Sequence, residues 1–324
     1  MTAGALGGKA KPIPKELLSA LRRIEISTAR LANEQLVGSY SSSFKGQGLA
    51  FQEVRPYQPG DDIRTIDWNV SARMNEPFIK KFVEEREMTV MLVVDLSRSM
   101  LFGTKRAAKA HVASEITALV SFSAIKNGDR VGLILGGHES ERVVAPKKGE
   151  KHVLRVLREV LGAEFGSASE QPAVAAPASA AAQGMGAHTP LRQMLEQLVR
   201  ITKRRSITFV VSDFFATDYD RVLAIAARKH DVIPVVLSDP RDMELPNVGL
   251  VWVEDLETGE SRLVDTGDAS VRKMYKSAAE KHKRERLRVF GKLGLDVVHV
   301  TTGGPFVEPF RELFQRRAKR SRSR

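Results

Sequence analysis

The stretch Met88-Thr89-Val90-Met91-Leu92-Val93-Val94, followed directly by Asp95-Leu96-Ser97-Arg98-Ser99-Met100, decides the fold of this chain. A short apolar run rich in valine is typical of a strand buried on both faces, as in a parallel sheet. The strand is expected to end in a turn that presents one carboxylate and two hydroxyls. These hard oxygen ligands suit Mg²⁺ or Mn²⁺ better than zinc or copper.

Strands and helices alternate along the chain after this first strand. The sequence predicts strands over 130–136, 206–213, 232–238 and 296–302, and helices over 104–126, 149–162, 190–203, 218–229, 269–293 and 306–318. It also predicts an antiparallel partner strand over 142–145 and a hairpin that joins 250–253 to 261–264. The alternation favours an α/β fold with a doubly wound, mostly parallel sheet that helices cover on both faces.

Two later segments place further oxygen ligands where a parallel sheet would bring them together. Thr189 stands before the helix that starts at Pro190, and Asp213 ends the strand over 206–213. In open α/β sheets, ligands bind beyond the carboxyl ends of the strands, at the point where the strand order reverses. The simpler alternative is that Asp95 and the two serines only cap the helix expected near Thr104.

The combined set resembles the metal-ion-dependent adhesion site of von Willebrand A domains, and it consists of Asp95, Ser97, Ser99, Thr189 and Asp213. The resemblance implies that the three hydroxyls bind Mg²⁺ or Mn²⁺ directly and that the carboxylates act more often through water. Neutral hydroxyl ligands leave the cation much of its charge and an open position. An acidic side chain of a protein partner is the natural group to fill that position.

A second distinctive block covers residues 51–73 and contains Arg55-Pro-Tyr57-Gln-Pro-Gly60-Asp61-Asp62 and Asp67-Trp68-Asn. Together with 78–87 and the strand that ends at Asp95, it strongly resembles the bacterial domain-of-unknown-function 58 family, over about residues 38–302. Segments 245–250 and 255–260 look like the same family, whereas the alanine-rich insertion before Thr189 departs from it. The resemblance implies a von Willebrand A-like domain with a preceding β-rich segment, often encoded near MoxR-type AAA+ ATPases.

Charges of both signs alternate around Tyr57 and Trp68 in this block. The pattern favours an ion-pair network that fastens the segment onto the main domain, in preference to a substrate site. Residues 39–87 are too few, and too often interrupted by glycine and proline, to form a stable core alone. We therefore expect Tyr57 or Trp68 to pack against the main sheet.

The expected domain organisation has four parts. Residues 1–14 form a disordered start, and 15–87 hold an N-terminal helix (15–36) and the β-rich segment, packed on the main domain. Residues 88–315 form the von Willebrand A-like domain, with a flexible insertion over 166–187, and 316–324 form a basic tail. Half of the net charge of +12 lies in this tail, which we expect to be solvated, so nucleic acid is an unlikely partner.

Composition limits the chemistry and the compartment. Cysteine is absent, which removes disulfides, zinc thiolate sites and cysteine nucleophiles. Neither a signal peptide nor an apolar run of about 20 residues is evident, so the sequence predicts a cytoplasmic protein without a membrane span.

Taken together, these features favour a non-enzymatic, metal-dependent interaction protein. The family resemblance implies a MoxR-type AAA+ ATPase or its client as partner, in protein remodelling or metallocofactor assembly. One alternative is a Mg²⁺-dependent phosphoester hydrolase with Asp95 and Asp213 holding the cation, although no general base or second carboxylate cluster is evident. The other alternative is association with nucleic acid through the basic tail.

Overall fold

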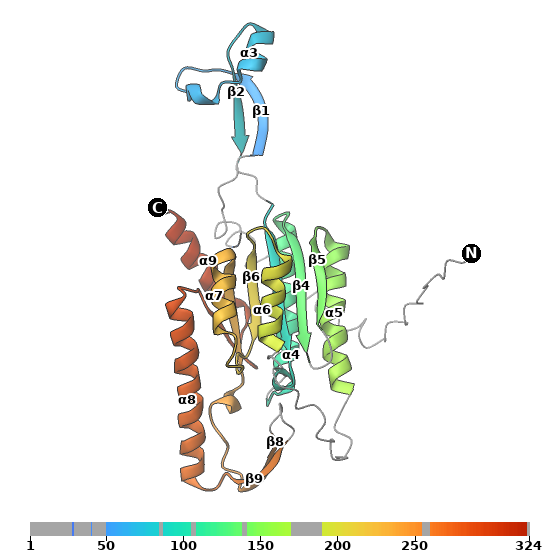
Figure 1. Cartoon of the computed structure of the whole chain (residues 1–324), viewed down its shortest axis with the longest axis vertical. Helices are drawn as coiled ribbons and strands as arrows, with labels where there is room; N and C mark the ends of the chain where they lie inside the picture. Colours follow the sequence, from blue (N-terminus) through green and yellow to red (C-terminus); the bar gives the residue numbers. More distant parts are fainter. Residues whose placement is uncertain are drawn as a thin grey trace, which may run out of the picture.

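The computed structural model of the chain describes Thr28, Tyr40 and residues 50–83, 87–104, 108–137, 141–169, 190–254 and 260–322. Its centre is a six-stranded sheet in the order β10-β7-β6-β3-β4-β5 (Figure 1). The strands are β3 (Thr89–Leu96), β4 (Arg130–Gly137), β5 (Arg142–Lys147), β6 (Ile207–Ser212), β7 (Asp231–Ser238) and β10 (Val298–Thr301). Neighbouring strands are parallel, except that the edge strand β5 runs antiparallel to β4.

The strand order confirms the doubly wound, mostly parallel sheet that the sequence predicts. If the six strands are numbered along the chain, their order across the sheet is 3-2-1-4-5-6. In this arrangement the chain winds outward from β3 in one direction and then, from β6, in the other. The carboxyl ends of β3 and β6 therefore lie side by side at the switch point, where α/β sheets bind ligands.

Helices cover both faces of the sheet. One face packs against α4 (Lys109–Lys126), α5 (Glu150–Ser169) and α9 (Val307–Arg322). The other packs against α6 (Pro190–Ile201), α7 (Asp220–Lys229) and the C-terminal part of α8 (Ala269–Lys292). None of the helices in the described part of the chain has the length and apolar content needed to cross a bilayer.

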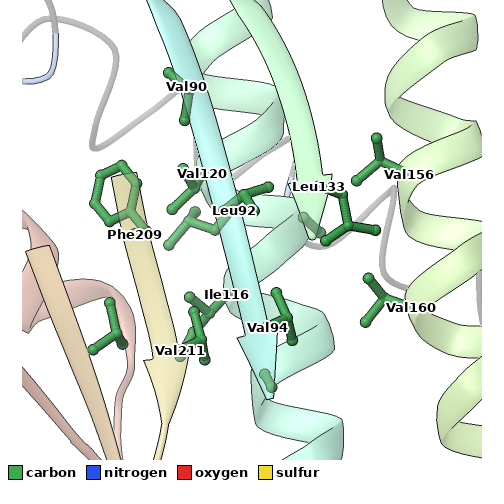
Figure 2. Packing of buried hydrophobic residues seen from close by; sticks show 14 of the residues in the cluster. Val90, Leu92, Val94, Ile116, Val120, Leu133, Val156, Val160, Phe209 and Val211 are labelled. Carbon is green, nitrogen blue, oxygen red and sulfur yellow. The ribbon is translucent and has the colours of Figure 1, made fainter. Parts of the chain in front are cut away.

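Strand β3 feeds both halves of the core because successive side chains point to opposite faces. Leu92 and Val94 pack toward α4 and α5 with Phe209 of β6 (Figure 2). Met91 and Val93 pack toward α6 and α7 on the other face. All of these side chains are fully buried, which is why the strand reads as a continuous apolar run.

Residues 50–83 form a separate hairpin unit, with β1 (Ala50–Pro56) antiparallel to β2 (Phe78–Val83). The short helices η2 (Ile63–Thr65) and α3 (Trp68–Met74) connect the two strands. The hairpin unit stands away from the main sheet (Figure 1). Of the two aromatic residues expected to pack against the main sheet, Trp68 does not, because it is 69% exposed. Tyr57 is half-buried, and its N–H donates to the Pro77 carbonyl oxygen of the same unit.

In the contacts that the structure describes, the charged residues of the hairpin unit do not dock it onto the main domain, because they bond to charged side chains and backbone N–H groups within the unit. Arg55 donates two hydrogen bonds to the Asp61 carboxylate, at 2.9 and 2.7 Å. Asp62 caps η2 and Asp67 caps α3 through backbone N–H groups. The alternating charges therefore brace the turn between β1 and β2. The sequence pattern alone does not distinguish ion pairs inside the unit from ion pairs to the main domain.

The C-terminal basic run is also more structured than expected. Helix α9 continues to Arg322, so residue 316 is not a boundary between a domain and a tail. Arg317 forms ion pairs with Asp231 at 2.7 Å and with Asp296 at 2.8 Å. These pairs tie the start of the basic run to the edge of the sheet.

The predicted hairpin, N-terminal helix and alanine-rich insertion have different outcomes. The predicted hairpin is present as β8 (Leu250–Glu254) and β9 (Ser261–Asp265). Of the predicted helix over 15–36, only Thr28 lies within the described residues, where it is helical and buried. Helix α5 continues to Ser169, into the expected insertion, and the remainder of the insertion, with Thr189, lies outside the described residues.

A buried carboxyl at the start of β4 predicts a pH dependence of stability. Asp129 is 1% exposed and accepts hydrogen bonds from the Tyr40 hydroxyl (3.1 Å) and from the Met88 N–H (2.9 Å). Burial raises the pKa of Asp129 to about 6, despite these two bonds. Between about pH 4 and pH 6 the folded protein keeps a proton that the unfolded chain has released, so this group makes stability fall as the pH rises.

We expect Asp129→Asn to remove this fall. Between pH 4 and pH 7, Asp129 should lower the free energy of unfolding of wild type by up to about 3 kcal/mol, and the variant should not show this loss. Urea unfolding at both pH values measures the shift, and any constant cost of the substitution cancels in the comparison. A difference between variant and wild type that does not change with pH would contradict the prediction.

Candidate metal centre

The candidate site lies where β3 and β6 end beside each other. Val94 pairs with Val211 across the two strands, which makes Asp95 and Ser212 the next neighbours. By strand alternation both side chains point to the sheet face that α6 and α7 cover. The Ser212 hydroxyl donates a hydrogen bond to Asp95 Oδ2 at 2.7 Å, and this bond ties the two strand ends together.

The turn after β3 gathers the two other serines. The Ser97 N–H donates to Asp95 Oδ1 at 2.9 Å, and the hydroxyls of Ser97 and Ser99 form a hydrogen bond of 3.1 Å with each other. A short helix, η3 (Arg98–Leu101), follows, and its Met100 is fully buried in the core. Met100 thereby anchors the turn and holds both hydroxyls beside the carboxylate.

The electrostatic environment of Asp95 favours a nearby cation. Its side chain is only 4% exposed. Burial, together with the negative charge of Asp213, raises the pKa of Asp95 to about 6, although bonds from Ser212 and Ser97 oppose the rise. A cation between the two carboxylates would stabilise their ionised forms.

The donor set fits Mg²⁺ or Mn²⁺. Adjacent ligands of an octahedral cation with bonds of about 2.1 Å lie roughly 3 Å apart, close to the 3.1 Å between the hydroxyl oxygens of Ser97 and Ser99. Across the ranges that the structure describes, no cluster of three or more His, Cys, Asp or Glu could hold a metal. A cation at this site would therefore depend on hydroxyl ligands.

The structure brings four of the five expected ligand residues to this end of the sheet, and Thr189 lies outside the described residues. Asp213, which is 2% exposed, has a partner that the sequence did not suggest. Lys109 Nζ donates to Asp213 Oδ2 at 3.0 Å, and the Phe215 N–H donates to Asp213 Oδ1 at 3.2 Å. Asp213 is therefore held by the protein on both of its oxygens.

Lys109 is itself buried, with 1% of its side chain exposed. It also donates to Asp242, after β7, at 3.3 and 3.2 Å to the two carboxylate oxygens. The aromatic rings of Phe215 and Phe102 lie 5.1 and 5.9 Å from its ammonium group. One lysine thus joins the start of α4 to the ends of β6 and β7.

Helix α8 fixes the backbone after β6. Arg286 Nη1 donates to the carbonyl oxygen of Asp213 at 2.8 Å, and His282 Nε2 lies 2.9 Å from the carbonyl oxygen of Phe214. Phe214 has a φ of 55°, uncommon for a residue with a side chain, and its buried ring packs edge-on against Phe290. These contacts hold Asp213 in one orientation.

Sequence reasoning missed Ser212, Lys109 and Asp242 as parts of this site. Ser212 directly precedes Asp213, so strand alternation could have assigned it to the same face as Asp95. The sequence gives only a weak indication that Lys109 is buried, which is its place at the start of a mostly apolar helix. Asp242 carries no signal of its own, because it reaches the site from a separate turn, η4 (Pro240–Asp242).

Comparison with known proteins supplies the family. The model of the family described as protein of unknown function DUF58 matches residues 53–285. The chain belongs to the DUF58 family. This match confirms the family resemblance that the block over 51–73 and the strand ending at Asp95 suggested.

Two relatives of this DUF58 chain carry names that describe them as uncharacterized proteins. The Mycobacterium tuberculosis protein Rv1480 is 30% identical over 288 residues, which cover 89% of this chain and 85% of the relative. Bacillus subtilis YeaD is 26% identical over 210 residues, which cover 65% of this chain and 45% of YeaD. Among solved structures, the VWA domain of SpRpn10 is similar at 12% identity and a TM-score of 0.32, covering 71% of this chain and 95% of that domain.

Proposed function

We propose that this chain is a metal-dependent protein-interaction module. Its cation would be Mg²⁺ or Mn²⁺, held by Asp95, Ser97, Ser99, Thr189 and Asp213. The observation that carries the proposal is the meeting of the Asp95 carboxylate with the hydroxyls of Ser97 and Ser99 at the switch point of the sheet. Once bound, the cation would offer an open position to a carboxylate of the partner.

The residues around the site suit binding better than turnover. Asp95 accepts bonds from Ser97 and Ser212, and Asp213 is held by Lys109, so both carboxylates have fixed positions. His282 contacts the backbone and stacks on Phe215 at 5.1 Å between ring centroids. A phosphoester hydrolase would need a general base or a second group of acidic ligands, and neither role has a candidate among these contacts.

We infer the partner class from the family resemblance. It points to a MoxR-type AAA+ ATPase, or a client of such an ATPase, in protein remodelling or metallocofactor assembly. The chemistry of the site sets one requirement, which is an acidic side chain on a protruding part of the partner, because the carboxylates of the site lie nearly buried at the end of the sheet.

A pull-down tests the proposal directly. The immobilised full-length chain should retain a MoxR-type ATPase from the same organism in buffer with millimolar Mg²⁺, and should release it when a chelator is added. A partner variant in which candidate Asp and Glu residues are replaced by Asn and Gln should not be retained. Retention that survives chelation would show that the contact does not use a metal.

A further inference from the structure

Lys109 places a fixed positive charge next to the candidate cation site. Its ammonium group bonds one oxygen of Asp213 and both oxygens of Asp242, and all three side chains are at least nine-tenths buried. Asp213 therefore already has a counter-charge, supplied by the protein. Two carboxylates around one ammonium leave the triad with one net negative charge.

Two features of its position are unfavourable for the charge of Lys109. It is the first residue of α4, where the helix dipole repels a cation, and no acidic residue stands in the first turn to offset this. Removing an ammonium group from water carries a further cost, which the two close carboxylates offset more strongly than the rings of Phe102 and Phe215 do. Lys109 is thus held by Asp213 and Asp242, and this dependence makes it sensitive to any other cation at Asp213.

We propose that Lys109 is a tethered competitor of the divalent cation for Asp213 and so sets the affinity of the site. This inference rests on the proposed function. A divalent cation and an ammonium group repel each other when they share one buried carboxylate. Asp242 offers Lys109 a second anchor, so Lys109 can release Asp213 to the cation without becoming an unpaired buried charge.

The competition explains how such a site could depend on its partner. With Asp213 engaged by Lys109, the cation would be held mainly by Asp95 and the serine hydroxyls, which carry a single negative charge. A carboxylate from the partner then supplies the missing charge. Cation and partner would bind cooperatively, because each raises the affinity for the other by the same factor.

Binding of Mn²⁺ to the full-length chain, followed by electron paramagnetic resonance without any partner, tests the inference. Lys109→Met should bind Mn²⁺ roughly tenfold more tightly than wild type, or better, because a neighbouring positive charge is gone. Lys109→Arg keeps the charge and should bind no more tightly than wild type. Lys126→Met removes the same charge from the exposed last turn of α4 and should resemble wild type.

A charge-balanced variant covers the risk that Lys109→Met does not fold. Lys109→Met combined with Asp242→Asn removes one charge of each sign and leaves Asp213 free, so its affinity for Mn²⁺ should also rise. Adding Asp95→Ala to either variant should abolish the binding, which assigns it to this site. Circular dichroism confirms that each variant is folded.

The outcomes separate this inference from the proposed function. If wild type binds Mn²⁺ in an Asp95-dependent manner and neither folded Lys109 variant binds more tightly, the competition is refuted and the metal site stands. If no chain binds Mn²⁺ in an Asp95-dependent manner, the competition is refuted, and the pull-down in Mg²⁺ against chelator decides the proposed function separately. Tighter binding by the Lys109→Met variants alone, with wild-type behaviour in Lys109→Arg and Lys126→Met, supports the competition.

Discussion

Replacement of Asp95 by asparagine should abolish metal-dependent association with the partner. Among the described residues no lysine bonds the Asp95 carboxylate, whereas Lys109 bonds Asp213, so the loss of Asp95 leaves the cation with neutral hydroxyls and a shared Asp213. Loss of a residue that supports a metal through water or a hydrogen bond typically costs 10–100-fold in metal affinity, and Asp95 also supplies negative charge, so its loss should cost roughly 100-fold. The pull-down in Mg²⁺ should then match the chelator background.

Two comparisons make the Asp95 result interpretable. Glu150→Gln removes one carboxylate charge from an exposed position at the start of α5, near the amino end of β4 and so at the other end of the strands, and should retain the partner as wild type does. Mg²⁺ should raise the melting temperature of wild type and Glu150→Gln but not of Asp95→Asn, because binding to the native state stabilises it. A folded Asp95→Asn variant that retains the partner in Mg²⁺ would refute the adhesion-site interpretation.

Replacement of Phe209 by alanine should have the largest effect on stability, lowering the free energy of unfolding by about 3–5 kcal/mol. Phe209 is fully buried in β6, next to β3, and its ring centroid lies 6.1 Å from that of Phe310 in α9. The truncation would leave a cavity between the sheet and this helix, in the layer shown in Figure 2. Urea unfolding followed by circular dichroism measures the loss.

Trp68→Ala provides the matched aromatic control. Trp68 lies in the hairpin unit and is 69% exposed, so its truncation should change the free energy of unfolding by no more than about 0.5 kcal/mol. Near-equal effects of the two substitutions would contradict the arrangement in Figure 1, because Trp68 would then have to be buried against the main domain.

The hairpin unit and the basic run show where local patterns misled the prediction. Charges that alternate over a short segment are equally compatible with docking onto another domain and with caps and ion pairs inside the segment. Here Arg55 and Asp61 pair with each other, six positions apart. Likewise, the sequence alone predicts that a run of arginines is a solvated tail, whereas in the structure Arg317 pairs with Asp231 and Asp296.

The sequence by itself determined the sheet and the central part of the site. Burial on both faces requires an apolar run, so β3 and β6 could be located from composition over a few residues. The turn from Asp95 to Ser99 is local as well, because its carboxylate and hydroxyls lie within five consecutive residues and point into one site once the strand ends.

Only the tertiary structure decided the charge balance of that site. Lys109 and Asp213 are 104 positions apart, and Lys109 and Asp242 are 133 positions apart. No periodicity or spacing connects such residues, because their contact depends on which strands are neighbours and where each connecting turn ends. The sequence therefore predicted that oxygen-bearing side chains meet at this end of the sheet, and the fold added the buried lysine that bonds one of them.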